Sequence, residues 1–115
     1  MLEELNRTNL LYDIYAPLLT ERQRQVIQLY FSDNYSLAEI ASDYEISRQA
    51  VYDLIRRVLS SLEKLEQKLG LYQLFKDQQQ LLDEAEQLLL QDNIEQADIK
   101  RLREIIAALR SSSEQ

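Results

Sequence analysis

A single glycine and a single proline in 115 residues are the feature that most constrains this fold. Tight β-turns depend on these two residue types, and folds with many strands need many such turns. Hydrophobic residues make up 45% of the sequence, which supports a packed core and argues against a disordered chain. The sequence therefore predicts an all-α protein of about one domain's length.

The residue types that are missing exclude several classes of function. Without His or Cys the chain has no Ser-His triad, thiolate nucleophile, typical zinc site or disulfide. A single glycine cannot build a phosphate-binding loop. No apolar run approaches the roughly 20 residues that span a bilayer, and the N-terminus lacks the basic region of a signal peptide. We expect a cytoplasmic protein that is not an enzyme, holds no cofactor or metal and contacts no membrane.

Helix-start signals divide the chain. Apolar residues at helical spacing fill residues 2–15, and the Ala16-Pro17 pair ends that helix because the residue before a proline avoids helical geometry. A Ser or Thr followed three residues later by Glu or Gln is a capping box, in which two side chains satisfy exposed backbone amides. The sequence offers the pairs Thr20 with Gln23 and Ser36 with Glu39, a lone Ser47, and a weaker pair, Asn93 with Gln96.

A long helix is predicted to follow Ser47 and to end at Gly70, a residue suited to the left-handed position after a helix. One apolar stripe runs along it, formed by Val51, Leu54, Val58, Leu62, Leu65 and Leu69. Two further amphipathic segments, residues 71–91 and 96–110, are predicted to form a hairpin. The division is therefore a helix-turn-helix domain at residues 1–70 and C-terminal packing or dimerisation helices at 71–115, with a frayed end.

The segment LAEIASDYEISRQAVYDLIR fits a helix-turn-helix motif. The motif needs a small residue where its two helices cross, and Ala41 is there; Ile40, Tyr44, Ile46, Val51 and Leu54 supply the apolar positions around it. Glu45 stands in the turn where a glycine is usual, so we expect left-handed backbone there. The residues predicted to face a nucleic acid are Ser47, Arg48, Gln49, Tyr52, Arg56 and Arg57.

The charge on the motif argues against strong DNA binding. Residues 47–58 hold three arginines and Asp53, a net of +2, whereas residues 36–46 hold three carboxylates, a net of −3. The motif as a whole is −1, within a chain of net charge −7. Because affinity for nucleic acids rests largely on neutralised phosphates, we expect duplex DNA to bind weakly.

The stretch LTERQRQVIQLYFSDNYSLAEIASDYEISRQAVYD resembles the fourth region of bacterial sigma factors, which contacts promoter DNA through a helix-turn-helix. The lead-in YDIYAPLLTERQRQVIQLYF, followed by YSLAEIA and SRQAVYD, is more similar still to the YlxM family. The resemblance runs from about Leu10 to Leu69 and beyond Gly70 is one of length and helical character. It covers the helix-turn-helix residues Ser36 to Arg56, and it brings no catalytic residues.

The YlxM resemblance implies a small helical regulator in the signal recognition particle pathway. Its implied partners are the particle's GTPase, the GTPase's receptor or the particle's RNA. From the motif alone, a DNA-binding transcriptional regulator is the alternative. The acidic C-terminal third, with 5 basic and 9 acidic residues, fits either a solvated face or a surface for a basic partner.

The apolar stripes beyond the helix-turn-helix need a cover, because monomers rarely expose large apolar patches. We therefore expect a two-fold homodimer. The alternative is a single chain whose stripes close on one another as a bundle of five or six helices. The candidate interface residues are Leu62, Leu65, Leu69, Leu74, Leu81 and Leu88.

Overall fold

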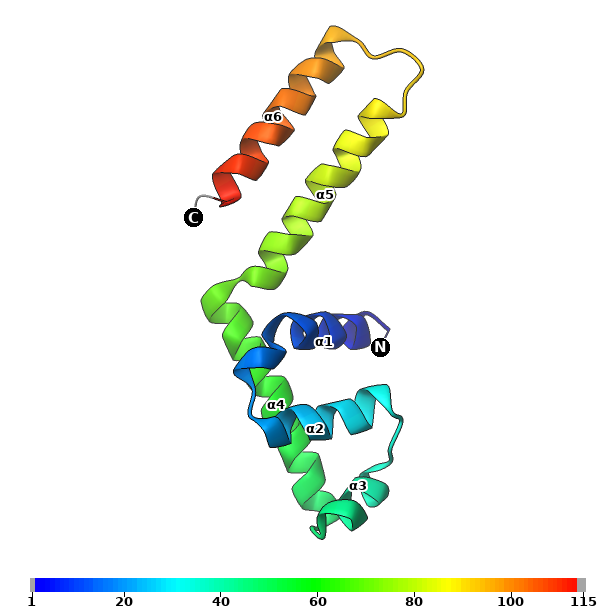
Figure 1. Ribbon diagram of the computed structural model, residues 1–115, viewed down its shortest axis with the longest axis vertical. Coiled ribbons are helices and arrows are strands. Elements are labelled where there is room, and N and C mark those ends of the chain that lie inside the picture. The colour runs from blue at the N-terminus through cyan, green and yellow to red at the C-terminus, as the bar shows by residue number, and fades with distance from the viewer. Residues whose placement is uncertain (1, 114–115) are drawn as a thin grey trace. The chain divides into compact units, whose positions relative to one another are not determined.

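The computed structural model describes residues 2–113, and the side chains of residues 6–112, and it confirms the all-α fold (Figure 1). The described residues contain no strand. They form α1 (Leu2–Tyr15), α2 (Glu21–Ile27), α3 (Leu37–Tyr44), α4 (Arg48–Leu69), α5 (Leu71–Leu89) and α6 (Gln96–Ser113). The chain divides at Gly70 into two compact units, which are described one at a time.

In the first unit, α1, α2 and α3 all pack against the long helix α4 (Figure 1). The core side of α4 is formed by residues spaced by four, three and four, as an amphipathic helix requires. These residues are Val51, Ile55, Val58 and Leu62. The apolar stripe predicted from the sequence included Leu54 and omitted Ile55. In the structure Ile55 is buried and Leu54 is half-buried.

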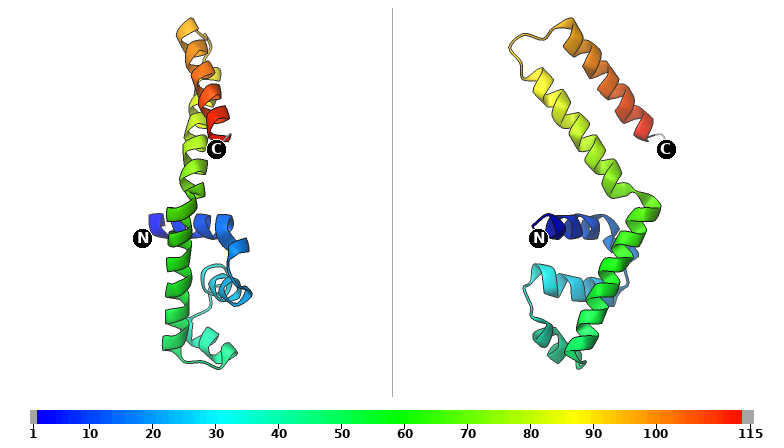
Figure 2. Two further views of the ribbon diagram at one scale, coloured as in Figure 1. Left: turned by 90° about the vertical axis from the view of Figure 1, so that its left-hand side faces the viewer. Right: turned by 180° about the vertical axis from the view of Figure 1, so that it is seen from behind.

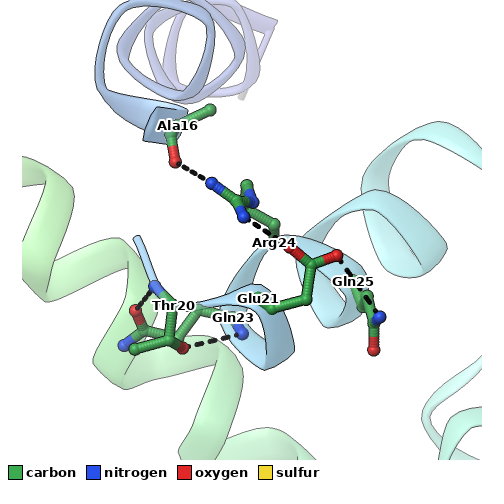
Figure 3. Close-up of polar contacts among 6 residues, drawn as sticks. All are labelled: Ala16, Thr20, Glu21, Gln23, Arg24 and Gln25. Atoms are coloured by element: carbon green, nitrogen blue, oxygen red, sulfur yellow. Dashed lines mark hydrogen bonds and ion pairs between the residues drawn. The ribbon is translucent and has the colours of Figure 1, made fainter. Parts of the chain in front are cut away.

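The predicted capping boxes at the starts of α2 and α3 are both confirmed. At α2 the Gln23 backbone N–H donates to Thr20 Oγ1 over 3.2 Å, and the Thr20 N–H donates to Gln23 Oε1 over 2.9 Å (Figure 3). Ser36 and Glu39 repeat the pattern at α3, over 3.1 and 3.2 Å. Each pair satisfies two backbone amides that a helix start leaves without internal partners.

Arg24 links the start of α2 to the turn before it. Its guanidinium donates to the Ala16 carbonyl over 3.3 Å and also pairs with Glu21 (Figure 3). The hydrogen bond from Arg24 holds the pKa of Glu21 below its ordinary value. The negative Glu21 lies in the first turn of α2, where the helix dipole favours it.

The end of α2 widens into a π-helical turn, Gln28–Ser32, which the sequence did not predict. The Asp33 N–H donates to the Gln28 carbonyl five residues earlier, over 3.0 Å, and Asn34 then takes a left-handed conformation with φ 59°. Asn tolerates this region better than most residues. The chain therefore leaves the helix at Asp33 and turns at Asn34 toward α3.

Two side-chain contacts fasten α1 to α4. Arg7 forms a two-pronged ion pair with Glu63, both N–O distances being 3.0 Å, and its hydrogen bond lowers the pKa of the Glu63 carboxyl. The buried Tyr15 donates its hydroxyl hydrogen bond to Glu66 Oε1 over 2.6 Å. The helix that ends at the predicted Ala16-Pro17 stop is thus part of the first unit.

The second unit is an antiparallel hairpin of α5 and α6 (Figure 2). Among its described residues only Ile105 is fully buried. The weaker capping box predicted at Asn93 is wrong: α6 begins at Gln96, and the Glu95 N–H donates to Asp98 Oδ2 over 3.0 Å. Asp98, three residues along, provides the acceptor that Gln96 was expected to provide.

Candidate nucleic-acid interface

The turn of the helix-turn-helix has the strained geometry that the sequence predicted. Glu45 adopts a left-handed conformation, with φ 55° and ψ 43°. The next residue, Ile46, donates its N–H to the Ala41 carbonyl over 3.0 Å and thereby closes the end of α3. Ala41 is buried, as expected for the residue where the two helices approach.

The start of α4 is fixed by Ser47, whose Oγ accepts the Ala50 N–H over 3.0 Å. The predicted inner residues Ile40 and Val51 are fully buried, so the opposite side of α4 faces outward. All six predicted contact residues are exposed at the start of α4 or along its outward side, and we call them together the α4 outer face: Ser47, Arg48, Gln49, Tyr52, Arg56 and Arg57.

Contacts within the α4 outer face link these residues in pairs. The Gln49 amide donates to Asp53 Oδ1 over 3.1 Å, and the Arg56 guanidinium lies 5.7 Å from the centre of the Tyr52 ring. In the described residues, no carboxylate forms an ion pair with Arg48, Arg56 or Arg57. The face therefore presents three cations that can meet a partner.

Asp53 is the residue of this face that the list of candidates left out. It lies one helical turn after Gln49. An amide and a carboxylate four residues apart on a helix can form a hydrogen bond, and this spacing can be recognised in the sequence. Asp53 therefore occupies the side-chain amide that would otherwise pair with an adenine edge. A carboxylate at this position also repels phosphate.

The helix preceding the turn adds further negative charge. Glu39 and Asp43 on α3 and Glu45 in the turn are all exposed. In helix-turn-helix complexes the first helix crosses the DNA backbone. The acidic surface of α3 would thus meet phosphates, which opposes binding.

The residues predicted to form a dimer interface occupy different environments. Leu62 is 1% exposed within the core of the first unit, which leaves no side-chain surface for a second copy. Leu69 is 52% exposed, and the other four, Leu65, Leu74, Leu81 and Leu88, are half-buried.

Among the described residues no cluster of acidic side chains is arranged to hold a metal ion. None of the described helices is long and apolar enough to cross a membrane.

The sequence matches a known family over residues 2–102, and the family is described as "Putative helix-turn-helix protein, YlxM / p13 like" (UPF0122). The match includes the whole helix-turn-helix and extends into the second unit as far as residue 102. The chain belongs to this family.

Curated relatives support the same assignment. The UPF0122 protein of Listeria innocua is 44% identical over 100 residues, which are 87% of this chain and 91% of the relative. The protein of Geobacillus sp. is 50% identical over 91 residues, 79% of this chain and 83% of its own. The protein of Bacillus mycoides is 43% identical over 109 residues, 95% of this chain and 99% of its own.

Proposed function

We propose that this YlxM-like chain is a non-enzymatic regulatory protein of the signal recognition particle pathway. It acts by binding the particle's GTPase, the GTPase's receptor or the particle's RNA. The pathway rests on the family resemblance. The binding role rests on the α4 outer face, which presents exposed polar and aromatic side chains around an ordered helix start.

The observation that carries the proposal is the carboxylate of Asp53 in the middle of the α4 outer face. Asp53 engages Gln49, and the neighbouring α3 exposes Glu39 and Asp43. A surface of this kind attracts polyphosphates weakly, so it favours the GTPase or its receptor over the particle's RNA. It suits a protein partner that offers cations to the carboxylates and an acidic or aromatic group to the arginines.

Duplex DNA is the second candidate partner, and one observation favours it. Arg48, Arg56 and Arg57 are exposed on the helix that enters the major groove in proteins of this architecture. As a transcriptional regulator, the chain would read bases with Arg48 and Gln49 and hold the backbone with Arg56.

A direct titration separates the two candidates. The purified chain is added to the particle's GTPase with its RNA, and separately to genomic duplex, each at low and at physiological salt. We expect a saturable change in GTP hydrolysis and only weak, strongly salt-dependent duplex binding. Saturable duplex binding at physiological salt, with no effect on the GTPase, would overturn the proposal in favour of DNA.

Three single substitutions sharpen the test. If the chain reads DNA, Arg48→Ala and Gln49→Ala abolish sequence-selective binding, while Arg56→Ala weakens binding to all sequences and lowers the salt slope by about one. On the proposed function, Arg48→Ala and Arg56→Ala should instead weaken the effect on GTP hydrolysis, because these arginines of the α4 outer face then contact the protein partner.

Asp53→Asn provides a matched probe of the decisive carboxylate, because it keeps the side-chain shape and removes one negative charge. Weak duplex binding should increase in this variant, since the repulsion of phosphate is removed. A duplex affinity that does not change would show that Asp53 does not restrict DNA binding, against the argument given above.

A further inference from the structure

The helix α5 carries two parallel apolar rows, of which only one faces α6. Successive members of the inward row are spaced alternately by three and four residues, as in the interface of a coiled coil, and we call this row and its counterpart on α6 the seam. Its members on α5 are half-buried: Leu71, Leu74, Gln78, Leu81, Ala85 and Leu88. The second row follows one position later at seven-residue spacing. Phe75, Leu82 and Leu89 form it, and they are 51%, 50% and 59% exposed.

The helix α6 repeats this arrangement. Its inward row is Asp98, Leu102, Ile105, Leu109 and Ser112, and Ser112 accepts a hydrogen bond from Gln78 of the α5 seam over 3.4 Å. The residues that follow Asp98 and Ile105 are again apolar. Ile99 is half-buried, and Ile106 is 52% exposed.

An ion pair shows which residues of α5 and α6 lie on the same side of the hairpin. Glu84 immediately precedes the seam residue Ala85, and Arg101 immediately precedes the seam residue Leu102. The two form a two-pronged ion pair over 2.5 and 2.8 Å, so residues that precede the seam share one side of the hairpin. In two facing antiparallel helices, residues that follow the seam then share the opposite side.

The second rows of both helices therefore form one surface, which we call the outer apolar face: Phe75, Leu82, Leu89, Ile99 and Ile106. From Phe75 to Leu89 the row spans fourteen residues, about 21 Å at the rise of an α-helix. A continuous apolar face of this length needs a cover.

Charged residues at the two edges of the outer apolar face indicate that a second copy of this chain covers it. Glu86 lies between Leu82 and Leu89 on the α5 edge, and Arg103 lies between Ile99 and Ile106 on the α6 edge; both are exposed. A two-fold axis parallel to the helices places the α5 edge of one copy beside the α6 edge of the other. Glu86 then faces the edge that carries Arg103, so the surface is complementary to itself.

The surface of α6 also has room for a partner's side chains. Two shallow hollows lie along it, one lined by Ile99 and Arg103 and the other by Arg103 and Ile106. We propose that two copies of this chain pack outer apolar face against outer apolar face as a four-helix bundle, with α5 of each copy against α6 of the other.

The oligomeric state of the full chain tests this proposal. Light scattering at micromolar concentration should give twice the 13.6 kDa of one chain. Leu82→Asp should give a monomer, whereas the control Gln80→Asp, an exposed position of the same helix that is outside both apolar rows, should stay dimeric. A monomeric parent chain, or a Leu82→Asp variant that stays dimeric, would overturn the proposal.

A charge exchange tests the orientation and covers the case in which Leu82→Asp fails to fold. Glu86→Arg places an arginine opposite Arg103 of the other copy at both symmetry-related edges of the dimer. We expect this repulsion to raise the dissociation constant of the dimer about tenfold. Adding Arg103→Glu should restore the parent dissociation constant. If Glu86→Arg has no effect, or if the double variant is no better than the single one, α5 does not pack against α6 of the other copy.

Discussion

The two units of this chain use similar amphipathic helices and reach different degrees of burial. In the first unit the three preceding helices cover α4, and Ile40, Val51 and Val58 are fully shielded from solvent. In the second unit, α5 has no fully buried residue among those described, and α6 has only Ile105. Two helices have too little surface to bury both of their apolar rows. The first unit therefore completes its own core, whereas the second leaves an apolar row exposed that the proposed dimer would cover.

The largest expected effect tests the core of the first unit. Ile40→Ala removes a fully buried side chain and should lower the free energy of unfolding by about 3 kcal/mol. Leu69→Ala, at a half-exposed position of the same unit, should cost less than about 1 kcal/mol. Urea unfolding followed by circular dichroism measures both. Equal losses would mean that the first unit does not have the distinct core described above.

A smaller effect is expected where α1 joins α4. Tyr15→Phe removes the hydrogen bond from the buried Tyr15 to Glu66 while keeping the ring. Hydrogen bonds to charged groups contribute about 1.5–3 kcal/mol, and we expect a loss near the lower value because Glu66 is only half-buried. A variant as stable as the parent in the same urea experiment would show that this hydrogen bond does not contribute to holding α1 on α4.

The left-handed turn residue gives an effect of opposite sign. Glu45→Gly should stabilise the first unit by roughly 0.5 kcal/mol, because relief of backbone strain exceeds the added freedom of the unfolded chain. Gly70 provides the reverse comparison, because it has a similar φ of 63° and, apart from its chain neighbours, no other residue lies within 4 Å of the position that a Cβ would take. Gly70→Ala should lower the melting temperature, and Glu45→Gly should raise it. A melting temperature that falls in Glu45→Gly would contradict this account of the turn.

The smallest effect concerns the ion pair of the second unit. The hydrogen bond from Arg101 lowers the pKa of Glu84, so the carboxylate stabilises the hairpin above the ordinary Glu pKa of about 4.3. That contribution is lost as the pH falls through the lowered pKa. Glu84→Gln should therefore melt below the parent at pH 7 and approach it in acid. A difference that is the same at both pH values would exclude this linkage.

Much of the first unit could be predicted from local signals. Thr20, Ser36 and Ser47 begin helices where the sequence placed them, and Glu45 takes the left-handed conformation expected in the turn. The π-helical turn after α2 carries no comparable signal. The choice of Ile55 over Leu54 could not be made either, because both fit the helical spacing from Val51 and only the packing of the other helices selects one.

The second unit shows more clearly which features could not be predicted from the sequence. Leu74, Leu81 and Leu88 and the row one residue later have the same seven-residue spacing, so either could face inward. The pairing of Glu84 with Arg101 shows which row faces inward, and it joins residues that the sequence alone does not connect. At the candidate site, exposure of the α4 outer face was predictable, whereas the hydrogen bond between Gln49 and Asp53 depends on side-chain conformation.

Hydrogen exchange of the full chain at low and high protein concentration tests most directly the claim that only the second unit needs a partner copy. Backbone amides of α5 and α6 should become more protected as the concentration rises, because the dimer covers the outer apolar face. Amides of α3 and of the first turns of α4 should exchange at the same rate at both concentrations. Protection of α5 and α6 that does not depend on concentration would contradict the account.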